Sequence, residues 1–178
     1  LFFLRNSAMS AALSMYQVSV PVFLRALGNL RHVLEKGEAN ARERGDDPAA
    51  LLQARLYEDM LPLVRQVQIA TATAKSGAAR LAGLESPRFE DTETTFDELY
   101  ARLDAVSDYL RTFDEAALQG SETRAVTLST RTRGDLHFDG RGYLFGFALP
   151  NLFFHVTTAY AILRHNGVPL GKVDYLGQ

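Results

Sequence analysis

The stretch TFDELYARLDAVSDYLRTF, Thr95 to Phe113, carries the clearest structural signal in this sequence. Thr95 and Glu98 form a capping-box pair, in which each side chain accepts a hydrogen bond from a first-turn N–H group. Apolar side chains then recur at steps of three and four residues, at Phe96, Leu99, Leu103, Val106, Leu110 and Phe113. This spacing places them along one side of an α-helix and suits antiparallel packing in a helical bundle.

Helices are also expected on the N-terminal side of this stretch. The first runs from Tyr16 to about Arg44, and a short one from Ala49 to Arg55 follows the Asp47–Pro48 pair. A longer helix runs from about Asp59 to Ala82, with Pro62 inside its first turn. Because this helix is rich in Ala, Thr and Ser, it either lets a neighbouring backbone approach closely or leaves a cavity beside it.

On the C-terminal side the apolar period changes. Polar and apolar residues alternate around Val126 and Leu128, which predicts a β-hairpin with its turn near Arg133 and Gly134. An isolated hairpin is marginally stable, so we expect it to lie against the helices. A last helix is predicted from about Arg141 to Asn166, kinked at Pro150 and followed by an extended tail. The fold class is therefore mainly α, a four-helix bundle with a small β element.

Composition fits one domain with a sizeable core, because 47% of the 178 residues are hydrophobic and 22% are charged. We expect a loosely ordered extension over residues 1–14 and a single domain over 15–178.

The net charge of −2 gives no general attraction for nucleic acid or anionic membranes. The sequence has no cysteine, which fits a cytoplasmic protein, and its glycine patterns match no phosphate-binding loop, so no cofactor is expected.

Two of the four histidines, His155 and His165, lie on the predicted last helix. Ten residues of α-helix separate them by about 80° around the axis and about 15 Å along it, so they cannot bind one metal ion together. His165 is interpreted as a helix-end residue that interacts with free carbonyl groups.

His155 instead belongs to a polar stripe with Asn151 and Thr158 on an otherwise apolar helix. A buried stripe must be hydrogen-bonded, either inside the protein or to a ligand. The first interpretation is a core network with Gln66 or Gln68 opposite, and the second is a binding pocket, which would include Tyr160 of the same helix.

A second polar concentration spans Arg55 to Gln68, in RLYEDMLPLVRQVQ. One interpretation is an ion-paired helix entry. The other is the mouth of the same pocket, where Arg65 holds an anionic group, Tyr57 packs a ligand and Asp59 assists His155. The acidic run from Glu90 to Glu98 is interpreted as helix capping rather than as a calcium site.

The segments RLYEDMLPLVRQVQIA, FEDTETTFDEL and FALPNLFFHVTTAYAILRHNGVPLGKVDYLG resemble a domain-of-unknown-function family within the DinB-like superfamily. The resemblance covers about residues 15–177. It implies an up-down-down-up four-helix bundle, commonly dimeric, with a hairpin before the last helix. Metal-binding members of the superfamily carry one histidine on the second helix and an H-x-x-x-H pair on the fourth. His155 resembles the first histidine of that pair, but Ala159 stands at the second, and Gln66 or Gln68 stands where the helix-two ligand is expected.

These observations leave three functional hypotheses. The first is a bundle, expected from the resemblance to be a homodimer, that binds a small molecule or a partner between its second and fourth helices without metal. The second is a metal-independent enzyme that uses His155 as acid or base, assisted by Asp59 or Tyr57. The third is a structural interaction protein with a filled core.

Overall fold

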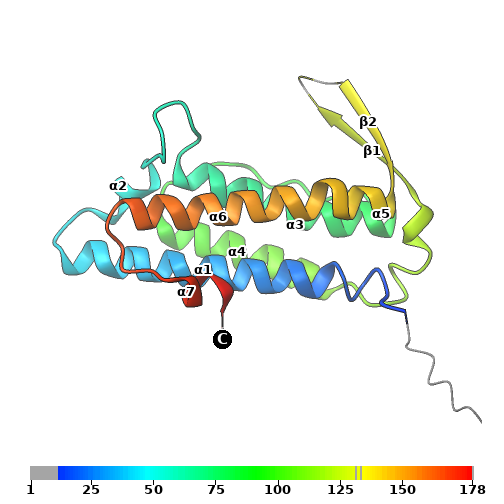
Figure 1. Cartoon of the computed structure of the whole chain (residues 1–178), viewed down its shortest axis with the longest axis horizontal. Coiled ribbons are helices and arrows are strands. Elements are labelled where there is room, and N and C mark those ends of the chain that lie inside the picture. The colour runs from blue at the N-terminus through cyan, green and yellow to red at the C-terminus, as the bar shows by residue number, and fades with distance from the viewer. Residues whose placement is uncertain (1–11, 131, 133, 178) are drawn as a thin grey trace, which may run out of the picture.

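Four long helices pack side by side in the computed structural model, which describes residues 12–130, 132 and 134–177 (Figure 1). Helices α1 and α6 run in one direction, and α3 and α4 run in the other (Figure 1). Their buried apolar sides meet in one core. The predicted mainly α bundle with a small hairpin is therefore confirmed. The four helices are α1 (Val20–Glu43), α3 (Leu63–Ala82), α4 (Phe96–Arg111) and α6 (Leu149–His165).

Helix α4 begins as its sequence predicts. Thr95 Oγ1 accepts a hydrogen bond from the Glu98 N–H at 3.2 Å, and Glu98 Oε2 accepts one from the Thr95 N–H at 3.1 Å. The short helix α2 (Pro48–Leu52) also follows its predicted cap, the Asp47 carboxylate. Helix α3 begins later than predicted, because Pro62 has an extended backbone and precedes the first turn.

Small residues on α3 allow α6 to pack closely against it. Ala70, Ala74 and Ala78 are completely buried. A Cβ atom added to Gly77 would lie 3.0 Å from the Phe23 ring and 3.8 Å from the Cβ of Ala148. The Ala- and Ser-rich composition of this helix therefore serves close approach.

The last long helix contains a π-turn where a kink is predicted. Helix α5 (Gly140–Tyr143) continues through the π-turn η2 (Leu144–Ala148) into α6. Pro150 has no N–H for the carbonyl group four residues earlier, and its ring would collide with that carbonyl in a regular α-helix. A wider turn immediately before the proline relieves this conflict.

The predicted hairpin is present and pairs β1 (Ala125–Thr130) with β2 (Gly134–Asp139) antiparallel, with Thr130 opposite Gly134. Gly134, which was expected at the turn, is thus the first residue of β2. It was expected to lie against the helices, but it projects from one end of the bundle (Figure 1). Phe138 holds its base, with ring centroids 6.1 Å from Tyr143 and 6.4 Å from Phe147. The hairpin is attached there to the 3₁₀ turn η1 (Ser121–Thr123) and to α5, which leaves its tip free of the bundle.

The C-terminal segment folds back as a short helix, α7 (Lys172–Leu176), where an extended tail was predicted. The Asp174 carboxylate accepts a hydrogen bond from the Gly171 N–H at 2.7 Å and pairs with Lys36 of α1 at 2.8 Å. This charged anchor stabilises one turn of helix that hydrophobic periodicity does not reveal. Of the expected N-terminal extension, residues 1–11 lie outside the described residues.

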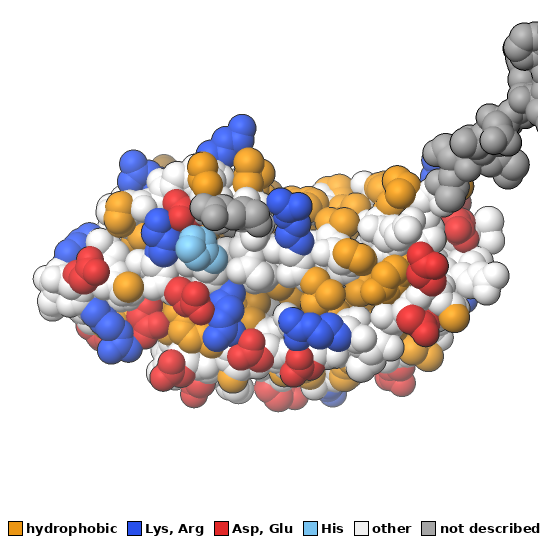
Figure 2. Space-filling model, turned by 90° about the horizontal axis from the view of Figure 1, so that it is seen from below, with side chains coloured by type: hydrophobic (Ala, Val, Ile, Leu, Met, Phe, Trp, Pro, Cys, Tyr) orange, Lys and Arg blue, Asp and Glu red, His pale blue; other side chains and the backbone are white. Residues whose placement is uncertain are grey.

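The side of the bundle seen from below carries acidic and basic side chains interspersed with apolar ones (Figure 2). Such mixing is typical of a solvated surface.

Candidate functional site

His155 lies on the buried side of α6, facing α3, and only 8% of it is exposed. Its Nδ1 atom lies 2.8 Å from Gln66 Oε1, and Gln66 Nε2 donates a hydrogen bond to the carbonyl oxygen of Leu61 at 2.9 Å. Leu61 is close because the chain reaches α3 through the extended backbone of Pro62. The structure thus brings His155 together with one of the two glutamines proposed as its partner.

The Leu61 carbonyl sets the direction of both hydrogen bonds in this His155–Gln66 pair. A carbonyl oxygen only accepts, so Gln66 turns its NH₂ group toward Leu61 and its oxygen toward His155. Nδ1 of His155 therefore carries the proton, and Nε2 keeps a lone pair.

Nε2 has no hydrogen-bond partner among the residues that the structure describes. Within the same residues, Ser121 Oγ is the one completely buried side-chain polar atom that lacks a partner. It follows that Nε2 is not completely buried and that solvent reaches it.

Burial lowers the pKa of His155 to about 4, because the imidazolium form would lose hydration in apolar surroundings. The Phe154 ring stands edge-on to the imidazole, with 5.2 Å between the ring centroids. Phe154 is 57% exposed. At neutral pH the site is therefore an uncharged hydrogen-bond acceptor beside one accessible aromatic ring.

The other residues of the predicted polar stripe are hydrogen-bonded within the protein. Asn151 Nδ2 donates to Thr73 Oγ1 at 2.8 Å, and Thr158 Oγ1 donates to the carbonyl oxygen of Phe154 at 2.7 Å. Tyr160 lies elsewhere on α6, where its ring packs edge-on against Tyr175 of α7 at 5.8 Å. His155 and Gln66 line none of five hollows found on the described surface.

Tyr57 and Asp59 lie in the segment 53–62, which projects from the bundle between α2 and α3 (Figure 1). Both side chains are exposed. No hydrogen bond or ion pair joins either of them to His155 within the described residues. The structure therefore does not bring this part of the predicted pocket mouth onto the imidazole.

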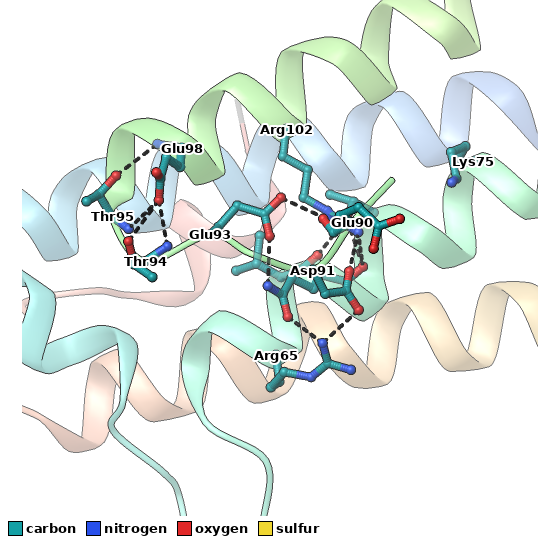
Figure 3. Close-up of polar contacts among 12 residues, drawn as sticks. Arg65, Lys75, Glu90, Asp91, Glu93, Thr94, Thr95, Glu98 and Arg102 are labelled. Carbon is teal, nitrogen blue, oxygen red and sulfur yellow. Dashed lines mark hydrogen bonds and ion pairs between the residues drawn. The ribbon is translucent and has the colours of Figure 1, made fainter. Parts of the chain in front are cut away.

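Arg65 and Gln68 belong to a second polar group, the Arg102 cluster, formed by Arg65, Gln68, Asp91, Glu93 and Arg102 (Figure 3). The Arg102 side chain is 3% exposed, and its guanidinium lies 2.9 Å from an Asp91 oxygen and 2.8 Å from a Glu93 oxygen. Gln68 Nε2 donates to Glu93 Oε2 at 2.7 Å, and Arg65 Nη1 lies 2.7 Å from Asp91 Oδ2. Gln66 and Gln68 thus have separate roles, because two residues of helix turn a side chain by about 200°.

The Arg102 cluster fastens the segment between α3 and α4 to both helices. Arg102 also donates to Thr71 Oγ1 at 2.7 Å and to the carbonyl oxygens of Glu90 at 3.0 Å and Gln68 at 3.4 Å, so all five of its N–H groups have acceptors. Burial alone would raise the pKa of Asp91, but the hydrogen bond from Arg65 and the charge of Arg102 outweigh it and lower that pKa. With its donors satisfied, the cluster is suited to holding the chain in place.

Sequence reasoning missed Arg102, although a signal for it exists. Arg102 lies three residues after Leu99 and four before Val106, on the apolar side of α4, where an arginine requires buried partners. The nearby acidic run supplies them. The capping interpretation of that run is correct for Glu98 but wrong for Asp91 and Glu93, which form ion pairs.

The side chains around His155 do not fit the metal site of the superfamily. Ala159 has no ligand atom and is completely buried, and Gln66 Oε1 is already engaged by Nδ1 of His155. Across the described ranges, no three His, Cys, Asp or Glu side chains are grouped to hold a metal ion. His155 Nε2 would be a single ligand without companions, which is too few for a protein zinc site.

Residues 15–176 match a family described as a domain of unknown function, DUF1993. The chain belongs to this family. The crystal structure of a DinB family member protein from Shewanella denitrificans is also similar, with 42% sequence identity, 92% of each chain covered and a TM-score of 0.84. A search of curated proteins found no match. The DinB-like relationship implied by the sequence is confirmed, and neither description names an activity or a ligand.

Proposed function

We propose that this DUF1993-family protein is a metal-independent binding protein whose ligand donates a hydrogen bond to His155 Nε2. One observation carries the proposal: Gln66 holds the imidazole in the Nδ1–H form, which leaves a lone pair on Nε2 without a partner among the described residues. An acceptor that solvent reaches and that a rigid helix holds in place is a preorganised contact for a ligand.

The chemistry around Nε2 defines the class of ligand. At neutral pH the ring is uncharged, because burial lowers the pKa of His155 to about 4. Its partner must therefore supply an O–H or N–H group. Phe154 is partly exposed beside the ring and favours an apolar or aromatic body on the same ligand.

The two other hypotheses have less support. For an enzyme, Asp59 and Tyr57 would need to contact His155, yet both are exposed in the projecting segment 53–62. A base whose conjugate acid has a pKa of about 4 is also weak at neutral pH. The filled-core hypothesis is supported by the complete pairing of Gln66 and Nδ1, but it assigns no role to Nε2.

Phenol is a suitable probe, because it joins one O–H donor to an aromatic ring. The ¹⁵N-labelled full chain is titrated with phenol, and the imidazole nitrogen resonances are followed by NMR. We expect the His155 Nε2 resonance to move as phenol binds, while His165, which is exposed at the end of α6, stays in place. Toluene, which has the ring without the donor, is the matched control and should not produce this shift.

A His155 Nε2 resonance that stays constant at millimolar phenol would favour the filled-core hypothesis and reject the binding site. Equal shifts of all histidine resonances would also reject it, because they would indicate a solvent effect.

We extend the proposal to a cytoplasmic location, since the cysteine-free sequence fits a reducing compartment.

A further inference from the structure

A hollow of about 160 Å³ opens between α1, α6 and α7, where α7 folds back against α1 (Figure 1). Its α1 side comes from positions 22, 25, 26 and 29, which share one face of a helix because they are spaced by three and four. The apolar residues of its wall are Val22, Ala26, Phe153, Val156, Tyr175 and Leu176. His155 and Gln66 do not line it, so this hollow is separate from the His155–Gln66 pair.

The size of the hollow suits one aromatic ring. A protein cavity of roughly 150 Å³ with apolar walls holds one benzene molecule. Ala26 is buried and has only a methyl group, so α1 leaves space at this point. Phe153 and Leu176 are partly exposed and give the hollow accessible apolar edges. Walls of this kind favour an apolar or aromatic ligand body.

Arg25 gives the hollow a positive charge. It is the one charged side chain among the described residues that line it. A guanidinium has five N–H groups, and in the described part of the chain this one makes a single hydrogen bond, from Nη2 to the carbonyl oxygen of Leu176 at 3.1 Å. By contrast, Arg31 and Arg42 of the same helix each pair with a glutamate. The remaining donors of Arg25 are therefore available to a carboxylate, which a planar guanidinium recognises through two parallel hydrogen bonds.

Helix α7 is fastened on both sides and forms the third wall of the hollow. Asn29 Nδ2 donates to the carbonyl oxygen of Tyr175 at 3.0 Å, and Lys36 Nζ lies 2.8 Å from an Asp174 oxygen. The Tyr175 hydroxyl lies 2.9 Å from Thr157 Oγ1 of α6. Because these contacts join α7 to both α1 and α6, the wall exists before a ligand binds, and binding requires little ordering of the chain.

We propose that this hollow binds a free aromatic carboxylate of about the size of benzoate, with its ring against Val22 and Val156 and its carboxylate on the Arg25 guanidinium. Inorganic phosphate would leave the apolar wall uncovered, and a neutral ring would leave Arg25 without a partner. An ionised aromatic carboxylate carries no O–H or N–H donor for His155 Nε2. This second site therefore stands or falls separately from the proposed function.

Benzoate is the probe for the first test. The full chain with ¹³C-labelled valine methyl groups is titrated with benzoate and followed by NMR. We expect the methyl resonances of Val22 and Val156 to shift and to show nuclear Overhauser effects to the ring protons of benzoate. Benzamide has the same shape without the charge and should bind about tenfold more weakly. Hexanoate, which carries the carboxylate on a flexible chain, should also bind more weakly than benzoate.

The second test separates the charge of Arg25 from its contact with α7. Arg25→Met should weaken benzoate binding about tenfold and leave benzamide binding unchanged, because the apolar wall stays in place. Arg42→Met removes an exposed arginine of the same helix that does not line the hollow, so it is the matched control and should bind benzoate as the wild type does. Val22→Phe fills the hollow and should abolish binding of both compounds. Circular dichroism verifies that the three variants are folded.

Four results would overturn the proposal. The first is the absence of shifts at Val22 and Val156 in millimolar benzoate, and the second is equal or tighter binding of benzamide or hexanoate. The third is benzoate binding that persists in Val22→Phe, which would place the ligand elsewhere. The fourth is a loss of benzamide binding in Arg25→Met, because it would mean that Arg25 acts only by holding α7.

Discussion

Ser121 is the clearest local defect in the described part of the chain. Its Oγ is completely buried and has no hydrogen-bond partner there. Such an atom loses its hydration without compensation. Ser121→Ala should therefore raise the free energy of unfolding by about 1 kcal/mol, measured by urea denaturation. Ser76→Ala is the control, because Ser76 Oγ pairs with Ser86 Oγ at 3.1 Å and its removal should not stabilise the protein.

His155 should make stability depend on pH in a defined range. Burial lowers its pKa from 6.5 to about 4, so between these values the unfolded chain binds more protons than the folded one. Its contribution to stability should be complete above about pH 6.5 and should be lost progressively as the pH falls to about 4. The double variant His155→Phe/Gln66→Leu removes both partners and should flatten this part of the curve. An unchanged pH dependence would contradict the described environment of His155.

Among the elements, α4 depends on Arg102 to hold the preceding segment. Arg102→Met would leave the largely buried Glu93 without its cation and Asp91 with Arg65 alone, at a cost of about 3 kcal/mol. Arg111→Met on the same helix removes an exposed pair with Asp108 and should cost less than about 1 kcal/mol. The free energies of unfolding are compared by urea denaturation. An equal decrease in the two variants would mean that the buried Arg102 cluster stabilises the protein no more than an exposed ion pair does.

The junction that carries the hairpin requires a glycine at residue 140. A Cβ there would lie 1.8 Å from the carbonyl oxygen of Ser121, so Gly140→Ala should cost about 3 kcal/mol or more. Gly28, inside α1, has open space where a Cβ would be, so Gly28→Ala should stabilise by about 0.5–1 kcal/mol. Thermal unfolding of the two variants is the measurement. A stabilised Gly140→Ala variant would contradict the close contact between η1 and α5.

The regular elements could be predicted from sequence, because period and capping are local signals. Helix α4 and the presence of the hairpin follow from such signals alone. The π-turn before Pro150 and the fold-back of α7 could not be predicted in the same way, because they depend on backbone geometry and on Asp174 contacts with distant residues. Pairing across helices was only partly predictable. The polar stripe indicated His155, but only the three-dimensional arrangement distinguishes Gln66 from Gln68 as its partner.

In the molecule as a whole, α6 has two distinct sides. Toward α3 it carries the His155–Gln66 pair, and toward solvent it exposes Phe145 and Phe153. The relation to a DinB family member supports the bundle architecture, while the proposed function depends on residues of this chain.

Metal independence is the central claim, and the most direct measurement is the metal content of the purified full chain after exposure to nickel or zinc and dialysis. Because His155 Nε2 has no companion ligand among the described residues, we predict far less than one equivalent of metal per chain. Retention of one equivalent that is lost in His155→Ala, but kept in the exposed control His165→Ala, would contradict the account.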